Sequence, residues 1–203
     1  MIKIDKVYTY GFAPTVRGMR NPLNSWDKSD SSNEGGVFVI GEKDLELFKR
    51  LVNSGNDHGK ALRMIQLWCD ILAPLYWWKE FDTYKVGTTA NSCSTMHKIA
   101  GKEFELDDFS TDHLSDRSIA ALGSSIMCMN HYRELYLETK KKDDWWQMIQ
   151  LLPTSYNQLR TVNLNYAVLR NMYHARKEHK LDEWRVFCKW VETLPYSELI
   201  TED

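Results

Sequence analysis

Several features that would assign a functional class directly are absent from this chain of 203 residues. No apolar run approaches the roughly 18 residues that a membrane span needs, and the N-terminal MIKID lacks the core of a signal peptide. The four cysteines are far apart and form no CxxC pair, which favours reduced thiols. The net charge of -2 argues against a broad basic surface for nucleic acid. We therefore expect a cytoplasmic protein that binds neither membranes nor nucleic acid.

Motifs for common chemistries are missing as well. The sequence contains no HExxH, no Walker loop, no GxGxxG after a strand and no GxSxG. His174 and His179 are five residues apart, a poor spacing for two metal ligands on one helix face, so no metal site is expected. What remains is an ordinary globular composition, with 43% hydrophobic and 27% charged residues. A length of 203 residues suits one sizeable domain or two small ones, and because no clear domain boundary appears in the sequence we expect a single domain over residues 1–203.

Periodicity predicts both strands and helices, and therefore an α+β fold. Alternation in residues 2–10 and the apolar run 37–40 indicate strands. Residues 61–72 suit a strand or a buried helix, and a strand is favoured because Pro74 follows. Helices are expected at 42–53, 74–85, 115–139 and 181–193. Residues 17–36 are polar with little periodicity, and a connection of this length is expected to be mobile, functional or both.

The last fifty residues carry polar groups where a helical pattern should be apolar. At 3.6 residues per turn, Val168, Met172 and Ala175 define the buried side of this pattern. The polar residues beside or within the same arc are Asn165, Arg176 and His179. Such groups are rarely buried without a partner. They are therefore expected to line a ligand site or a contact between subunits.

The segment 87–94, with the sequence GTTANSCS, is a second candidate for ligand contact. Glycine and small hydroxyl residues expose backbone N–H groups that can surround an anion. An ordinary surface loop is the alternative, and composition does not separate the two.

A set of spacings links these polar residues to a known family. The spaced residues are Leu152-Pro153, Asn165, Asn171, Arg176, His179 and Trp184-Arg185, with His58 ahead of Ala73-Pro74 upstream. Together these spacings are more specific than any one motif, and they run over most of the chain. In them the sequence resembles the flavin-dependent thymidylate synthases.

The chain departs from that family at its Arg-His-Arg signature. A gapless match places Thr83-Tyr84-Lys85 on Arg-His-Arg, Asn91 on the motif glutamate and Cys93 on the serine. A shift of one residue instead places Asn91 and Ser94 on the family's asparagine and serine. Both alignments of this loop remain open. Because two of the three signature cations are missing, we expect FAD to bind more weakly than in the family.

The resemblance implies a role for each matching residue. Flavin contacts are implied for His58, Lys85, Asn165, Asn171 and His179. Substrate contacts are implied for Lys79, Glu80, Asn91, Cys93, Ser94 and Arg176. Arg176 matches the arginine that recognises the pyrimidine base, where a fixed fork also lowers the cost of negative charge on the ring. It is therefore the implied catalytic residue. The alternatives are an interface salt bridge for Arg176 and an ordinary loop position for His58.

One substitution bears on the charge of the substrate. Ile149 stands where the family has an arginine that grips the nucleotide phosphate, and isoleucine cannot replace that bidentate contact. Whether the accepted pyrimidine is phosphorylated therefore stays open.

The resemblance also implies an architecture and a reaction. The family fold is a mixed or antiparallel sheet flanked by helices, and its active sites form between the subunits of a homotetramer. A tetramer also agrees with the apolar surface of residues 165–179 and of the tryptophan-rich segments. The family methylates deoxyuridylate at C5 with FAD and methylenetetrahydrofolate, with NADPH as reductant.

Three hypotheses follow from the sequence. The leading one is a divergent flavin-dependent enzyme that binds FAD and a pyrimidine nucleotide or nucleoside and transfers a one-carbon unit to C5. The second is a non-catalytic protein that binds or sequesters a nucleotide-like ligand on the same scaffold. The third is a structural homo-oligomer that keeps only the scaffold.

Overall fold

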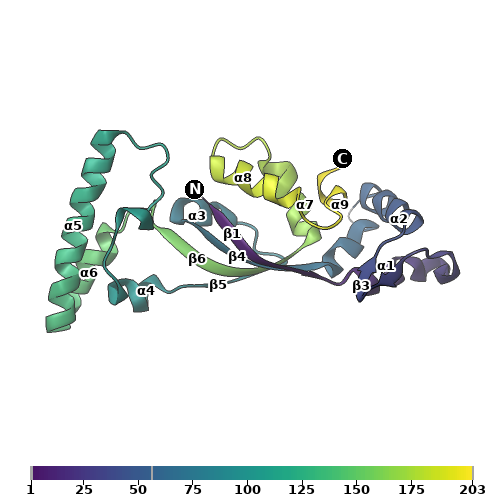
Figure 1. Ribbon diagram of the computed structural model, residues 1–203, viewed down its shortest axis with the longest axis horizontal. Helices are drawn as coiled ribbons and strands as arrows, with labels where there is room; N and C mark the ends of the chain where they lie inside the picture. The colour runs from purple at the N-terminus through teal and green to yellow at the C-terminus, as the bar shows by residue number, and fades with distance from the viewer. Residues whose placement is uncertain (1, 56, 203) are drawn as a thin grey trace. The chain divides into compact units, whose positions relative to one another are not determined.

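The computed structural model describes residues 2–55 and 57–202. Six strands form within this range: β1 (Lys3–Tyr10), β2 (Ser32–Glu34), β3 (Val37–Val39), β4 (Gln66–Pro74), β5 (Thr88–Ser92) and β6 (Asn157–Asn165). Four of them make an antiparallel sheet in the order β1-β4-β6-β5, while β2 and β3 pair as a small antiparallel hairpin. The expected α+β fold with an antiparallel sheet and helices is confirmed (Figure 1).

Helices occupy most of the remaining chain. The α-helices are α1 (Phe12–Arg20), α2 (Glu42–Asn53), α3 (Leu75–Phe81), α4 (Thr95–Lys98), α5 (Asp116–Thr139), α6 (Lys142–Leu151), α7 (Tyr166–Arg176), α8 (Asp182–Val191) and α9 (Glu198–Thr201). Short 3₁₀ turns lie at Asn21–Leu23, Trp26–Lys28, Gly59–Met64, Ile99–Gly101 and Leu106–Asp108. In the described part of the chain, no helix has both the length and the apolar character to cross a membrane.

The chain divides into two compact units. Unit 1 comprises Met1–Ile4, Ile71–Thr83 and Asn91–Thr161, and unit 2 comprises Asp5–Asp70, Tyr84–Ala90 and Val162–Asp203. Strands β1, β4, β5 and β6 each contribute residues to both units. The two units are described separately below.

Unit 1 is built around the helix pair α5 and α6, which lie side by side (Figure 1). Its core consists of Ile99, Phe104, Phe109, Leu122, Ile126, Met129 and Met148. Ser115 begins α5 as predicted, because its hydroxyl accepts a hydrogen bond from the Ser118 N–H. The spacing of Leu122, Ile126 and Met129 places all three on one face of the helix. The predicted helix and its buried face are confirmed.

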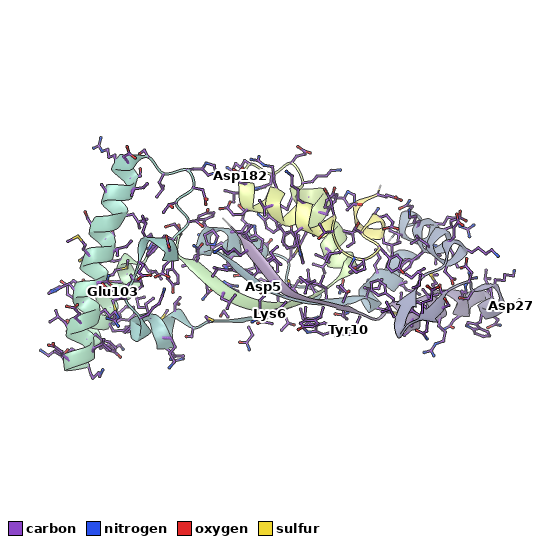
Figure 2. All side chains as sticks on the ribbon, in the orientation of Figure 1. Asp5, Lys6, Tyr10, Asp27, Glu103 and Asp182 are labelled. Carbon is purple, nitrogen blue, oxygen red and sulfur yellow. The ribbon has the colours of Figure 1, made fainter. Side chains whose placement is uncertain are left out.

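Unit 2 contains α1, α2, α7, α8 and α9. Its largest fully buried side chains include Phe48 of α2, Tyr166 of α7 and Trp184 of α8. The Tyr166 hydroxyl donates to the Pro195 carbonyl at 2.7 Å, which satisfies its one polar group. Within this unit, β1 and β4 also pair through their side chains. Figure 2 labels Lys6 of β1, whose Nζ lies 3.0 Å from Asp70 Oδ2.

A buried carboxylate orders the polar segment 17–36. Asp44 of α2 is fully buried, and its Oδ1 accepts from Arg20 Nε at 2.5 Å. Its Oδ2 accepts from the hydroxyls of Ser29 and Ser31, each at 2.6 Å, and from the N–H groups of Asp30 and Ser31, each at 3.2 Å. The absence of periodicity in this segment is therefore explained, because polar contacts to one side chain hold it in place.

The same contacts set the pKa of Asp44. Burial by itself would raise the pKa of this carboxyl. Hydrogen bonds from Ser29 and Ser31, together with the hydrogen bond and charge of Arg20, outweigh burial and lower the pKa below its ordinary value. The ionised form is therefore the form that the fold stabilises.

Residues 157–165 differ from the expected helical pattern. They form strand β6, which lies between β4 and β5 in the sheet. Its buried positions Gln158, Val162 and Leu164 follow the two-residue period of a strand. This segment is a strand because it pairs with β4 and β5. A 3.6-residue pattern in the sequence carries no information about pairing partners. Similarly, the segment 87–94 is not a plain loop, since β5 occupies most of it.

The buried face of α7 also differs from the expectation. Helix α7 buries Tyr166, Leu169 and Met172, whereas Val168 is half-buried and Ala175 is exposed. Of the three residues predicted to be buried, only Met172 is buried. The helix is rotated relative to the predicted arc because it packs against α8 and α9 within unit 2.

Replacement of Asp44 tests whether this contact stabilises the fold. Asp44→Asn keeps the shape but removes the charge that faces Arg20, and we expect a loss of about 3–5 kcal/mol in the free energy of unfolding. Asp182→Asn is the control, since Asp182 pairs with Arg185 on the surface at the start of α8 (Figure 2). The Asp182→Asn variant should lose less than about 1 kcal/mol in the free energy of unfolding. Urea unfolding of both variants measures the difference, and equal losses would contradict the role of Asp44.

Candidate functional site

A polar hollow lies at the N-terminal end of α7 in unit 2. Its volume is about 700 Å³, within the range of small-molecule sites. The polar side chains that line it are Arg63, Asn165, Arg170, Asn171 and His174, and Gly87 forms part of its wall. We call this cavity the α7 hollow. It brings together Asn165 and Asn171, two of the predicted flavin contacts.

Asn165 joins the hollow to the fold. It ends β6 and begins α7, and its Oδ1 accepts from the Val168 N–H at 3.1 Å. Asparagine is favoured at this cap position because it satisfies an N–H of the first helical turn. Since Oδ1 is committed to the cap, the amide nitrogen is the atom of Asn165 suited to contacting a ligand.

Gly87 approaches the same amide closely. A Cβ placed on Gly87 would lie 2.7 Å from Asn165 Nδ2 and 3.0 Å from Val168 Cγ2. Its φ of +78° also lies in the region that glycine adopts without penalty. Glycine at this position therefore keeps the wall of the hollow open.

Arg170 and His174 form a basic wall that the last helix holds in place. Arg170 Nη1 donates to the carbonyls of Leu199 and Ile200 at 3.4 and 3.3 Å, and also to the carbonyl of Glu202. The His174 ring lies 3.0 Å from the Ile200 carbonyl through Nε2. Asn171, on the turn between these two residues, has an exposed side chain.

A second cluster lies at the other end of α7 and contains Arg176. Its Nε donates to the Tyr84 hydroxyl at 2.9 Å. Its guanidinium carbon lies 5.0 Å from the centre of the Trp184 ring and 5.6 Å from that of Tyr84, within cation–π range of both. The rings of His179 and Trp184 pack edge to face with their centres 6.5 Å apart. The Nδ1 of His179 accepts a hydrogen bond from the Leu181 N–H.

Arg176 and His179, both predicted as site residues, therefore meet at one buried tryptophan. Neither Tyr84 nor Trp184 is predicted from the sequence as a partner of Arg176. Tyr84 lies 92 positions earlier in the chain, and spacing along a helix gives no signal for such a contact. Lys85, the neighbour of Tyr84, is exposed.

His58 lies apart from both clusters. It precedes the turn Gly59–Met64 and lines two other hollows of unit 2, of about 540 and 300 Å³. Basic side chains, among them Lys28, Lys43 and Arg50, line the larger of these. The structure thus places His58 in a different cavity from Asn165 and Asn171.

The remaining predicted substrate residues belong to unit 1. Lys79 and Glu80 lie on α3 with Lys79 exposed, and Asn91 is an exposed residue of β5. Cys93 donates its N–H to the Leu159 carbonyl at 2.9 Å, and the Ser94 hydroxyl caps α4 by accepting from the His97 N–H at 3.1 Å. Cys93 and Ser94 therefore have structural contacts of their own.

The four cysteines are free thiols. Burial raises the pKa of Cys69 and of Cys188 to about 12, so neither is a thiolate near neutral pH. Cys93 and Cys128 are exposed. Among the residues that the structure describes, no group of three metal-binding side chains comes together.

Comparison with solved structures identifies the fold. The flavin-dependent thymidylate synthase ThyX of Helicobacter pylori, solved with FAD and dUMP, matches with a TM-score of 0.70 at 20% identity, over 97% of this chain and 98% of that chain. The chain has the fold of the flavin-dependent thymidylate synthases. The UMP/dUMP methylase PolB of Streptomyces cacaoi, solved with 5-Br dUMP, matches with a TM-score of 0.67 at 14% identity, over 99% of this chain and 95% of that chain.

Comparison by sequence and comparison by structure give different results for this chain. No protein-family model matches the chain, and no curated protein matches it in sequence. The thymidylate synthase-like fold expected from the spacings is confirmed. The likeness shows the fold, and the roles of individual residues remain predictions.

The α7 hollow carries donors that suit the negatively charged diphosphate of a flavin nucleotide. FAD carries a negatively charged diphosphate, and the hollow presents two arginines and two amides beside a glycine that leaves room for close approach. The side chains present therefore fit such a cofactor. His58, in another cavity, is not part of this donor set.

Gly87→Ala tests whether the α7 hollow holds the cofactor. The added methyl group collides with Asn165 and Val168, so we expect a loss of at least about 2 kcal/mol in unfolding free energy together with loss of FAD binding. Gly55→Ala is the matched control, since Gly55 also has a positive φ of +99° but open space around its Cβ position. It should lose about 1–2 kcal/mol and keep FAD binding. Similar FAD binding by both variants would show that the hollow does not hold the cofactor.

Proposed function

We propose that this protein binds FAD and a pyrimidine nucleotide or nucleoside and transfers a one-carbon unit to C5 of the ring. The observation that carries the proposal is the arrangement on α7. The hollow with Asn165 and Asn171 lies at its beginning, and the held guanidinium of Arg176 lies at its end. Ten residues at 1.5 Å per residue separate the two ends by about 15 Å. An extended dinucleotide can bridge such a length.

The proposed cofactor site is the α7 hollow. Asn165 Nδ2 and the exposed Asn171 amide would donate to the cofactor, and Arg63 and Arg170 would offset its negative charge. The bound flavin, once reduced by NADPH, would supply the electrons that convert the transferred carbon to a methyl group. Methylenetetrahydrofolate as carbon donor and NADPH as reductant complete the proposal by analogy with the family.

The proposed role of Arg176 is to recognise the pyrimidine. A planar guanidinium held in one orientation can donate to a ring carbonyl. The same donors stabilise negative charge that develops on the ring when C5 reacts. Support comes from the contacts with Tyr84 and Trp184, which fix the orientation before a ligand binds. The H. pylori and S. cacaoi proteins, solved with dUMP and with 5-Br dUMP or 5-Br UMP, have the same fold.

A second candidate is a protein that binds or sequesters such a ligand without catalysis. The observation in its favour is Ile149 on α6, which packs against the apolar core of unit 1. At the position where the resemblance places a phosphate-binding arginine, this chain thus has a residue that packs against an apolar core. Release of the C5 hydrogen from labelled dUMP or UMP separates the two candidates, because only an enzyme catalyses it.

FAD titration tests the cofactor site. We expect a dissociation constant in the micromolar range or weaker, since two of the three signature cations are missing. Asn171→Ala should weaken binding by about tenfold through loss of one hydrogen bond to a charged group. Asn33→Ala, an exposed asparagine of β2 outside the hollow, should leave binding unchanged. No flavin binding by the unaltered protein would favour the sequestering or the scaffold hypothesis.

Two variants of Arg176 test the substrate site. If the planar fork reads a pyrimidine carbonyl, Arg176→Lys and Arg176→Ala should both abolish dUMP and UMP binding while the fold persists. The proposed homotetramer with sites between subunits should then persist in light scattering. If Arg176 instead forms an interface salt bridge, Ala should lower the melting temperature or dissociate the oligomer, and Lys should restore it. Unchanged nucleotide binding in both variants would remove the basis for this site.

A further inference from the structure

We infer that unit 2 contains a second ligand site, separate from the α7 hollow, which takes a phosphate monoester with an apolar body. The site consists of the two hollows that His58 lines, formed by α2 and residues 18–28 and 57–64. We call this pair of hollows the α2 site. It has no lining residue in common with the α7 hollow. The inference therefore does not rest on the proposed function.

Unpaired cations line the larger hollow of the α2 site, which has a volume of about 540 Å³. They are Lys28, Lys43 and Arg50, and none of the three has an ion pair or a side-chain hydrogen bond to the described part of the chain. Glu46 is the acidic residue of the same lining. Three positive charges beside one negative charge leave an excess that matches a dianion. A phosphate monoester is largely a dianion near neutral pH.

Arg20 adds a donor at a buried position of the larger hollow. Its residue surface is only 5% exposed. Its Nε donates to Asp44 Oδ1 at 2.5 Å, and its Nη1 donates to the Ser25 carbonyl at 3.2 Å. Its Nη2 has no hydrogen bond to any described residue. A phosphate oxygen bound in the hollow can therefore accept from Nη2 without displacing either contact.

The segment 20–28 is held in place without a ligand. The Ser25 N–H donates to the Arg20 carbonyl, and the Lys28 N–H donates to the Ser25 carbonyl, each at 3.2 Å. Buried Asp44 anchors both ends of the segment, since it accepts from Arg20 and from the hydroxyl of Ser29, the residue after Lys28. A wall that is already ordered lowers the entropy cost of binding.

The smaller hollow supplies an apolar surface beside these charges. It has a volume of about 300 Å³ and shares four lining residues with the larger hollow: Met19, Pro22, Leu51 and His58. Met64 lines the smaller hollow and is 48% exposed, while Leu23 lines the larger one and is 84% exposed. Large apolar side chains left exposed at a cavity are typical of ligand sites. A ligand with a phosphate at one end and an apolar body would occupy both hollows.

Phenyl phosphate is the probe, because it joins one phosphate monoester to one apolar ring. Calorimetry on the full chain should show saturable binding of one molecule. Arg50→Gln should raise the dissociation constant about tenfold through loss of a charged hydrogen bond. Lys189→Gln is the matched control, since Lys189 is an exposed residue of α8 that lines neither hollow. It removes the same charge and should change binding by less than about twofold.

Two further comparisons test the class of ligand. Benzoate has the same ring but a single negative charge, and it should bind at least about tenfold more weakly than phenyl phosphate. Leu23→Ser removes an exposed apolar side chain of the site. This variant should weaken phenyl phosphate binding about threefold to fivefold and leave the binding of inorganic phosphate unchanged.

Asn171→Ala separates the α2 site from the α7 hollow. Because Asn171 lines only the α7 hollow, this variant should bind phenyl phosphate as the unaltered protein does. Loss of binding in Asn171→Ala, equal losses in Arg50→Gln and Lys189→Gln, or no saturable binding at all would overturn the site. Benzoate binding as tight as that of phenyl phosphate would overturn the assigned ligand class. None of these results depends on whether the protein binds FAD or a pyrimidine.

Discussion

The junction between β6 and α7 is the constraint on which the candidate site depends. At this point one side chain, Asn165, ends a strand, caps a helix and lines the α7 hollow. Its cap commits Oδ1 to the backbone, and the close approach of Gly87 determines where Nδ2 can lie. The cap fixes where α7 begins, and packing against α8 and α9 orients the helix that carries Asn171 and Arg176.

Polar groups in unit 2 serve two different purposes. Arg20 and Asp44 satisfy each other within a network that includes two serine hydroxyls, so their charges stabilise the fold. Arg176 contacts two aromatic rings and a phenol oxygen, which restrain the direction of its guanidinium. A guanidinium with a restrained direction loses less side-chain freedom when it binds a ligand.

The departures from the family pattern have physical counterparts. Ile149, at a position where a phosphate-gripping arginine was expected from the resemblance, packs against an apolar core. Tyr84, on the signature histidine in the gapless match, contacts Arg176. Both residues thus have contacts of their own in this chain. The fold persists at 14–20% identity because apolar periodicity, caps and strand pairing tolerate such replacements.

The sequence by itself determined the local elements. Helices at 42–53 and 116–139, the Ser115 cap and the first strand follow from periodicity and capping, which act over a few residues. The tertiary structure decided the rest: residues 157–165 became a strand through pairing with β4 and β5, and α7 turned a different face to its neighbours. It also brought the Tyr84 hydroxyl into hydrogen-bond contact with Arg176 and placed His58 in a cavity other than the α7 hollow. Contacts between residues tens of positions apart depend on how elements pack, and no short-range pattern encodes them.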